Sequence, residues 1–172
     1  MDETWAITGA AVVVVRSGQL LMVMEQESRP DVHKKPNMAS VPMGATKPGE
    51  TIRENARREF REEAGYEVEL LYPVGFFTID MADYERVGIW AFAGEPGQQL
   101  GRPTSPSVRG PIWIPLRDFL NIPTHLVRPR VQEMVAAHQY LEVVCRDHGI
   151  NYVTDLVLRS APTAAKQLLL RE

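Results

Sequence analysis

Apolar and polar residues recur along the 172-residue chain with two different periods, which together predict a mixed α/β fold. Short apolar, β-branched runs bounded by turn residues indicate strands. These runs lie at residues 7–16, 20–24, 39–43, 66–71, 75–81, 87–93 and 112–114. Residues 25–38 are polar, and residues 94–111 are rich in glycine, proline and serine, so both segments are expected to be loops, the second of them mobile.

Helical spacing predicts the remaining elements. Thr51 and Glu54 have the spacing of a capping box and Gly65 suits a helix end, so a helix is expected from residue 52 to about residue 64. One helical turn is expected over residues 116–120 and a longer helix over residues 127–146. Residues 1–150 are therefore interpreted as one domain. Residues 151–172 are expected to form a C-terminal helical extension or tail, broken near Pro162.

The helix predicted at residues 52–64 carries carboxylates on its apolar side. Successive helical residues turn by about 100°, so Glu59 and Glu63 share a face with apolar residues, which are Ile52, Ala56 and Phe60. Clustered, partly buried carboxylates are unfavourable unless they are paired or bind a metal. A hard cation such as Mg²⁺ would relieve this cost. The alternative is a run of surface carboxylates with i, i+4 partners.

The same segment carries a recognisable motif. Residues 44–66 read GATKPGETIRENARREFREEAGY, which resembles the Nudix hydrolase signature G-x5-E-x7-R-E-U-x-E-E-x-G-U, where U is a bulky apolar residue. Every fixed position is matched, although Tyr66 fills the last apolar slot less typically than Ile, Leu or Val. The matched positions are Gly44, Glu50, Arg58, Glu59, Phe60, Glu62, Glu63, Gly65 and Tyr66. The resemblance extends over residues 7 to about 145.

The resemblance implies a fold and an activity. The fold would be a Nudix-type α/β/α sandwich with a mixed central sheet. The activity would be that of a Mg²⁺-dependent pyrophosphohydrolase, with Mn²⁺ able to substitute, which cleaves a nucleoside diphosphate linked to another moiety X. ADP-ribose-like compounds, dinucleoside polyphosphates, nucleoside triphosphates, nucleotide sugars and capped RNA all remain open as substrates. A non-catalytic nucleotide-sensing or regulatory module on the same fold is the alternative.

The resemblance also implies roles for individual residues. Glu59 and Glu63 are the expected main metal ligands, and the carbonyl of Gly44 would lie near the metal. Glu62 would be a further ligand or the base that activates water. Arg58 would pair with Glu50 and hold the loop against the helix. The expected catalytic residues are Glu62, Glu63, Arg58 and Glu50.

Candidates for substrate binding lie around the motif. Arg29, His33, Lys34 and Lys35 precede it and Lys47 lies within it, and cations near a metal site suit phosphate groups. We single out Arg29, Lys35 and Lys47, together with Glu95, as candidate substrate-site residues. An aromatic residue could stack on a base, although such residues are more often core. The aromatic candidates are Tyr72, Phe76, Phe77, Tyr84 and Trp90.

One position departs from the pattern of many relatives. They carry a further Glu before the strand predicted at residues 112–114, where this chain has Arg109-Gly110-Pro111. A fourth acidic group would then come from Asp83, Glu85 or Glu95, or be absent.

Composition restricts the partners. The formal net charge of −3 gives no electrostatic case for binding nucleic acid or an anionic membrane. The N-terminus does not read as a signal peptide and no apolar run approaches transmembrane length. A single cysteine, Cys145, allows no internal disulfide and suits a reducing compartment. A cytoplasmic protein acting on a small-molecule nucleotide diphosphate derivative is therefore expected, with a homodimer as a possible assembly.

Overall fold

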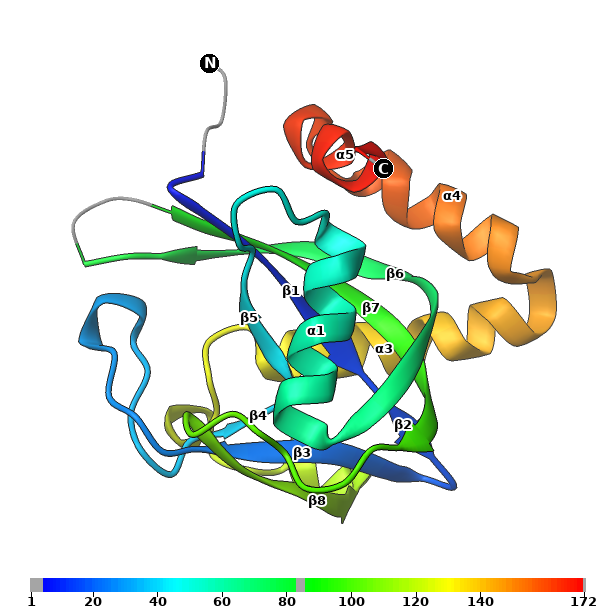
Figure 1. Cartoon of the computed structure of the whole chain (residues 1–172). Coiled ribbons are helices and arrows are strands. Elements are labelled where there is room, and N and C mark those ends of the chain that lie inside the picture. The colour runs from blue at the N-terminus through cyan, green and yellow to red at the C-terminus, as the bar shows by residue number, and fades with distance from the viewer. Residues whose placement is uncertain (1–4, 83–85, 172) are drawn as a thin grey trace.

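The computed structural model describes residues 5–82 and 86–171, which form two β-sheets flanked by helices (Figure 1). The strands are β1 (Ile7–Val13), β2 (Val15–Arg16), β3 (Gln19–Glu25), β4 (Ala39–Ser40), β5 (Met43–Ala45), β6 (Tyr66–Asp80), β7 (Arg86–Gln99) and β8 (Val108–Pro115). The α-helices are α1 (Ile52–Ala64), α2 (Leu116–Leu120), α3 (Val131–His148), α4 (Ile150–Ser160) and α5 (Thr163–Leu170). Short 3₁₀ helices lie at Pro30–Val32 and Thr124–Leu126.

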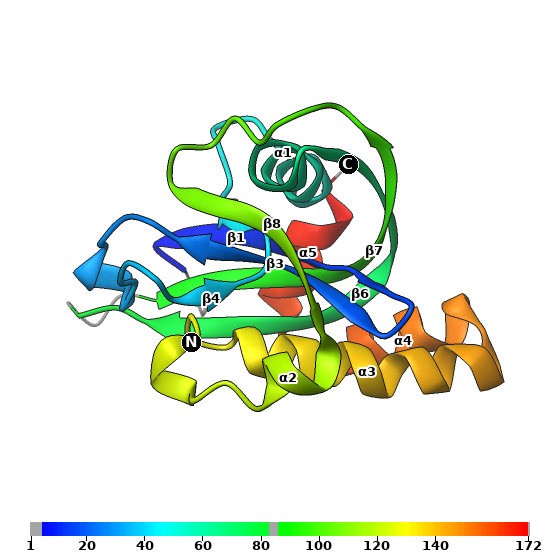
Figure 2. The same cartoon turned by 90° about the horizontal axis from the view of Figure 1, so that it is seen from below.

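The first sheet has the strand order β5-β1-β7-β6 and is mixed. β1 runs parallel to β7 and antiparallel to β5, while β6 and β7 form a long antiparallel pair. The second sheet is built on β3, which pairs with β2, β4 and β8. Figure 2 shows α1 on one side of the first sheet and α3 on the other. The predicted α/β fold with a mixed central sheet between helices is thus confirmed.

Helix α1 begins and ends at the residues that the sequence predicted. The Thr51 side chain accepts a hydrogen bond from the Glu54 amide, and the Glu54 carboxylate accepts one from the Thr51 amide. Gly65 ends the helix in the left-handed conformation that favours glycine. The buried face of α1 combines apolar side chains with two carboxylates. Its buried residues are Ile52, Asn55, Ala56, Glu59, Phe60, Glu63 and Ala64.

Two predicted strands divide between the sheets. The run at 7–16 is split at Val14, where the chain leaves β1 and crosses to β2 in the other sheet. The run at 39–43 likewise becomes β4, which pairs with β3, and β5, which pairs with β1. Continuous apolar patterning therefore marked the buried segments correctly but not the points at which the backbone changes its hydrogen-bonding partner.

The predicted loop at 94–111 is wrong at both ends, and the predicted strands at 66–71 and 75–81 are one strand. β7 continues to Gln99 and β8 begins at Val108, while β6 runs unbroken from Tyr66 to Asp80. The reason is main-chain hydrogen bonding between β6 and β7. This pairing includes the first part of the Gly- and Pro-containing segment, and register shifts accommodate irregularities along the two strands. Backbone pairing needs no apolar side chains, so the sequence pattern did not reveal it.

The C-terminal helices pack on the rest of the molecule. The indole Nε1 of Trp90 donates a hydrogen bond to the carbonyl oxygen of Ala165 at 2.9 Å, and Arg53 Nη1 donates one to that of Leu169, also at 2.9 Å. Ala165 and Leu169 are buried in the core cluster. The helices break at Pro162, as expected. None of the described helices combines the length and the apolar character needed to cross a membrane.

These contacts predict that α5 contributes to global stability. Leu169 is 3% exposed and Leu170 is 71% exposed. Leu169→Ala should lower the free energy of unfolding by about 2–3 kcal/mol through lost burial and a residual cavity. The matched control Leu170→Ala should change it by less than about 0.5 kcal/mol. Denaturant titration would measure both, and equal effects would show that α5 lies outside the cooperative unit.

Candidate active site

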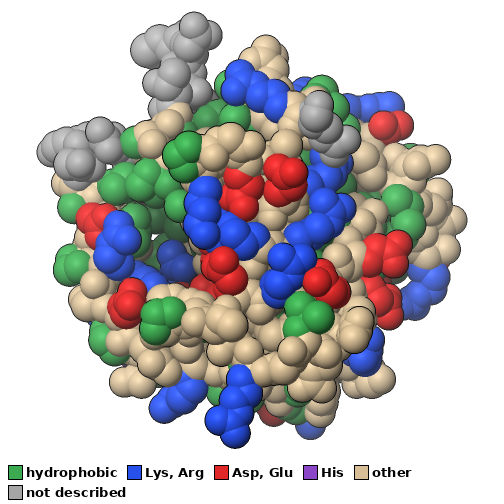
Figure 3. Space-filling view, viewed as in Figure 1, with side chains coloured by type: hydrophobic (Ala, Val, Ile, Leu, Met, Phe, Trp, Pro, Cys, Tyr) green, Lys and Arg blue, Asp and Glu red, His purple; other side chains and the backbone are tan. Residues whose placement is uncertain are grey.

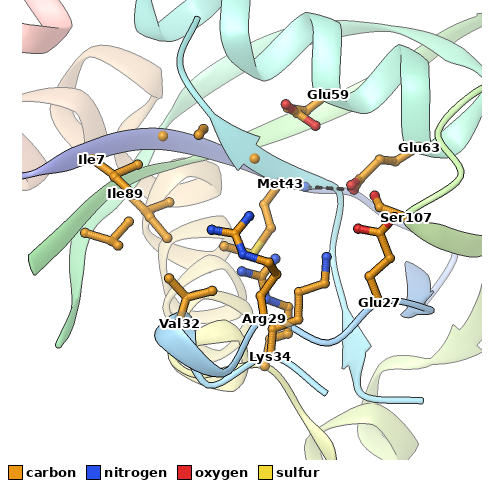
Figure 4. Close-up of a pocket in the computed structure, with 15 residues that line it drawn as sticks. Ile7, Glu27, Arg29, Val32, Lys34, Met43, Glu59, Glu63, Ile89 and Ser107 are labelled. Atoms are coloured by element: carbon orange, nitrogen blue, oxygen red, sulfur yellow. Dashed lines mark hydrogen bonds between the residues drawn. The ribbon is translucent and has the colours of Figure 1, made fainter. Parts of the chain in front are cut away.

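A cavity of about 270 Å³ opens beside α1, and both carboxylates and cationic side chains line it. Figure 4 shows Glu59 and Glu63 reaching it from α1, while Arg29 and Lys34 approach from the loop on the opposite side. Aliphatic side chains line another part of the wall, namely those of Ile7, Val32, Val87 and Ile89. Figure 3 shows that basic and acidic side chains are interleaved on this face of the molecule rather than gathered into a patch of one sign.

Glu59 and Glu63 are buried, as the helical angles predicted. Glu59 is 9% exposed and Glu63 is 4% exposed. Glu63 Oε2 accepts a hydrogen bond from the Met43 amide at 3.0 Å, which ties the helix to β5. Burial raises the pKa of Glu63 well above its usual range, and the nearby charge of Glu59 adds to this. Burial also raises the pKa of Glu59, although Arg58 opposes the shift.

Gly44 lies directly against the carboxylate of Glu59. A Cβ atom at this position would collide with the Glu59 carboxylate, so only glycine allows the approach. Glu59, Glu63 and the backbone of Gly44 therefore line one cavity and offer oxygen ligands of the kind that Mg²⁺ prefers. Within the described residues, no three His, Cys, Asp or Glu side chains are already arranged around a metal position.

Arg58 connects three carboxylates. Its guanidinium makes a bidentate pair with Glu50, with Nε 2.7 Å from Oε1 and Nη2 3.0 Å from Oε2. Nη1 donates to Glu59 at 2.6 Å and to Glu62 at 3.2 Å, and Nη2 donates to the carbonyl of Ala45 at 3.0 Å. The pair that the resemblance implied between Arg58 and Glu50 is thus present, and it fastens the loop before α1 to the helix.

The pKa values of this network follow from its contacts. The hydrogen bond to Glu50 is the main cause that raises the pKa of Arg58, with Glu59 adding to it. Partial burial favours neutral Glu50, but the Arg58 guanidinium and the Lys47 amide outweigh burial and lower the pKa of Glu50. Glu62 is directed toward Arg58 and lies 3.7 Å from Lys47 Nζ, so it is engaged in ion pairs beside the cavity.

The far wall of the cavity contains an ion cluster of Glu25, Lys34 and Arg128, of which the sequence predicted only Lys34 as a candidate. Glu25 is buried between Lys34 and Arg128, with 2.8 Å from Lys34 Nζ to Oε2 and 3.1 Å from Arg128 Nη1 to Oε1. Lys34 and Arg128 line the cavity. No spacing in the sequence signals this cluster, because Glu25 and Arg128 are 103 residues apart. A backbone bridge between Ala39 and Val127 brings them together.

The predicted substrate-site residues are only partly brought together. Arg29 lines the cavity, whereas Lys35 lines a separate hollow with His33 and His125. Lys47 lies beside Glu62 and does not line the cavity. Glu95 is exposed on β7, 4.0 Å from Arg16, and is not part of the cavity lining.

Other predicted candidates lie elsewhere. Asp83, Tyr84 and Glu85 lie outside the described residues, and none of the described aromatic candidates lines the cavity. Trp90 and Tyr72 are buried core residues instead. Glu27, which sequence reasoning passed over, is the additional carboxylate at the cavity wall, beside Ser107 in Figure 4.

Comparison with known proteins identifies the family. The family model described as the NUDIX domain matches residues 6–136, and the chain therefore belongs to the Nudix family. The expectation of an enzyme of the Nudix hydrolase class agrees with this membership. No curated protein matches the chain.

Solved structures share the fold at low identity. A NUDIX hydrolase from Nitrosomonas europaea has a TM-score of 0.68 at 18% identity, over 78% of this chain and 88% of that one. A MutT NUDIX hydrolase from Burkholderia pseudomallei has a TM-score of 0.63 at 19% identity, over 76% and 96%. An ADP-ribose pyrophosphatase from Streptococcus suis has a TM-score of 0.56 at 16% identity, over 76% and 87%. At these identities the likeness establishes the fold alone.

The Arg58–Glu50 contact predicts coupled effects on stability. Glu50→Ala and Arg58→Ala should be non-additive in the free energy of unfolding by roughly 1–2 kcal/mol, because either change alone breaks the same partly buried pair. The exposed pair Arg61–Glu67 provides a matched control, for which less than about 1 kcal/mol is expected. Denaturant titration of both double-mutant cycles measures the coupling, and additive effects at Glu50 and Arg58 would contradict the proposed role.

Burial of Glu63 predicts a pH dependence of stability in chelator. Its raised pKa means that folded protein retains a proton after the unfolded chain, whose pKa is near 4.5, has lost it. The stabilisation is present below pH 4.5 and is lost as pH rises through the folded-state pKa. Relative to Glu63→Gln, wild-type protein should therefore become less stable as pH rises from about 4.5. Thermal melts across pH test this, with the exposed Glu69→Gln as control, whose curve should parallel wild type.

Proposed function

We propose that this Nudix-family protein is a Mg²⁺-dependent pyrophosphohydrolase that cleaves a nucleoside diphosphate linked to another moiety X. One observation carries the proposal: two buried carboxylates of α1 face basic side chains across a single cavity. The acidic side suits a divalent cation, and the basic side suits the phosphate groups that such a cation accompanies. The pyrophosphatase name of the Streptococcus suis neighbour is in keeping with this activity.

The metal site would be built from few groups. Glu59, Glu63 and the Gly44 carbonyl would hold Mg²⁺, or Mn²⁺ in its place, and Glu62 would serve as a further ligand or as the base for water. When bound, the metal would neutralise the diphosphate and lower the pKa of a coordinated water. The donors fit this role because they are hard oxygens, and because like-charged buried carboxylates are costly without a counter-charge.

The other residues would position the reactants. Arg58 and Glu50 would keep the loop before α1 against the helix, so that Gly44 stays in contact with the Glu59 carboxylate. Arg29 on the basic wall and Lys47 beside Glu62 would bind phosphate oxygens. The aliphatic part of the cavity, formed by residues such as Ile7 and Ile89, would receive an uncharged part of the substrate.

We further propose that the substrate is a small nucleotide derivative and that the protein acts in the cytoplasm. The net charge of −3 and the interleaved surface charges in Figure 3 offer no broad basic surface for nucleic acid on this face. The single cysteine suits a reducing compartment. The homodimer implied by the family resemblance is a prediction for sedimentation analysis.

A substrate panel tests the proposal. With Mg²⁺ or Mn²⁺, the purified protein should release a nucleoside monophosphate from at least one nucleoside diphosphate derivative, and excess chelator should abolish release. Glu63→Gln should lower kcat by about 10²-fold or more, because it removes a charge at the reacting centre with little change in volume. The same variant should reduce the rise in melting temperature that Mg²⁺ causes in wild type.

The control variant Glu69→Gln, which alters an exposed strand residue, should match wild type in both measurements. Full activity in chelator would contradict the metal mechanism, and an unchanged kcat in Glu63→Gln would remove Glu63 from the site. Nucleotide-induced stabilisation without product from any compound would instead support the sensing alternative.

A further inference from the structure

The cluster of Glu25, Lys34 and Arg128 is buried where a solvated surface would be expected for three charged side chains. Their side chains are 2%, 11% and 11% exposed, respectively. One carboxylate lies between two cations, so the cluster retains one net positive charge. Burying such a charge is unfavourable unless an opposite charge reaches it.

The hydrogen bonding of the cluster is incomplete. Arg128 Nε is buried and has no hydrogen-bond partner among the described residues. Glu25 Oε2 lies 2.8 Å from Lys34 Nζ, which is an ion-pair distance, but it lacks the geometry of a hydrogen bond. A partly satisfied buried polar network destabilises the protein until a water molecule or a ligand completes it. Because Arg128 Nε is itself shielded from the cavity, the cluster presents its excess positive charge at the cavity wall through the other atoms of Lys34 and Arg128.

The backbone fixes both cations in place. The Arg128 amide donates a hydrogen bond to the Ala39 carbonyl at 2.9 Å, which anchors the segment before α3 to β4. Lys34 exchanges two backbone hydrogen bonds with Arg29, at 2.9 Å and 3.0 Å. These bonds close the turn that carries the side chains of Arg29 and Lys34. A binding site whose groups are held before the ligand arrives loses little conformational entropy on binding.

We infer that Lys34 and Arg128 form a second anion subsite, which receives an anionic group on X. This inference rests on the proposed function, since it assumes that the diphosphate lies at the carboxylates of α1 with its metal. A neutral X would bring no counter-charge to the excess positive charge of the cluster. A carboxylate, phosphate or sulfate on X would supply that charge and accept hydrogen bonds from the atoms of Lys34 and Arg128 that line the cavity.

Binding in excess chelator tests the subsite without any turnover. Inorganic phosphate is titrated into wild type and into Arg128→Met by calorimetry. Wild type should bind phosphate, and the variant should bind it roughly 10- to 100-fold more weakly because a charged hydrogen-bond donor is lost. The matched control Arg130→Met removes a nearby arginine that pairs with Glu133 and does not line the cavity. It should bind as wild type does.

A matched pair of nucleotides then separates the subsite from the diphosphate. The nucleoside diphosphates of glucose and of glucuronate differ by one carboxylate at nearly constant size, and both carry the nucleoside that the substrate panel selects. Wild type should bind the glucuronate form at least about tenfold more tightly. Arg128→Met should lose this preference, and Lys35→Met, next to Lys34 but outside the cavity, should keep it.

Any one of three results would contradict the second anion subsite. The first is absence of phosphate binding in wild type, and the second is equal affinity of wild type for the two nucleotides. The third is an equal loss of phosphate affinity in Arg128→Met and Arg130→Met. If Arg128→Met does not fold, the two wild-type measurements decide alone. A panel without product would count against the proposed function, while phosphate binding in chelator would still test the anion subsite.

Discussion

The guanidinium of Arg58 is the interaction on which the rest of the site depends. It holds Glu50 from the loop, Glu59 and Glu62 from the helix, and the carbonyl of Ala45 at the end of β5. These groups come from separate segments, and without a central cation the three carboxylates would repel one another. An arginine suits this position because its planar, permanently charged fork can bond several oxygens at fixed angles. The approach of Gly44 to Glu59 depends on two contacts, because Arg58 bonds the Glu59 carboxylate while strand pairing with Ala10 positions Gly44.

The two walls of the cavity carry unbalanced buried charges of opposite sign. On the α1 side, Glu59 and Glu63 are buried with too little positive charge, and on the other side Lys34 and Arg128 exceed the single charge of Glu25. The two sides interact, since Arg128 lowers and Glu25 raises the pKa of Glu63. A metal ion on the acidic side and a polyanion between the walls would relieve both, which is the physical reason for proposing a metal–nucleotide complex as substrate rather than either component alone.

The sequence predicted those parts of the site that local signals determine. Thr51, Glu54 and Gly65 mark the ends of α1 through contacts within a few residues, and the helical period then determines that Glu59 and Glu63 face inward. Arg128 could not be found in this way, because its place at the cavity depends on a bridge between Ala39 and Val127. The length of β6 and β7 was missed for the same reason: each is stabilised by a partner strand rather than by its own composition.

The C-terminal helices show how a segment outside the matched family region can still support the site. The NUDIX domain match ends at residue 136, yet α5 bonds to Arg53 of α1 and to Trp90 of β7. Arg53 lies one turn or more before the carboxylates on the same helix, and Trp90 lies opposite Ala10 on the neighbouring strand β1. The first turn of α1 and the centre of the sheet are thus held by the added segment. Because a helix moves as a rigid element, restraint at its first turn also restrains Glu59 and Glu63 farther along it.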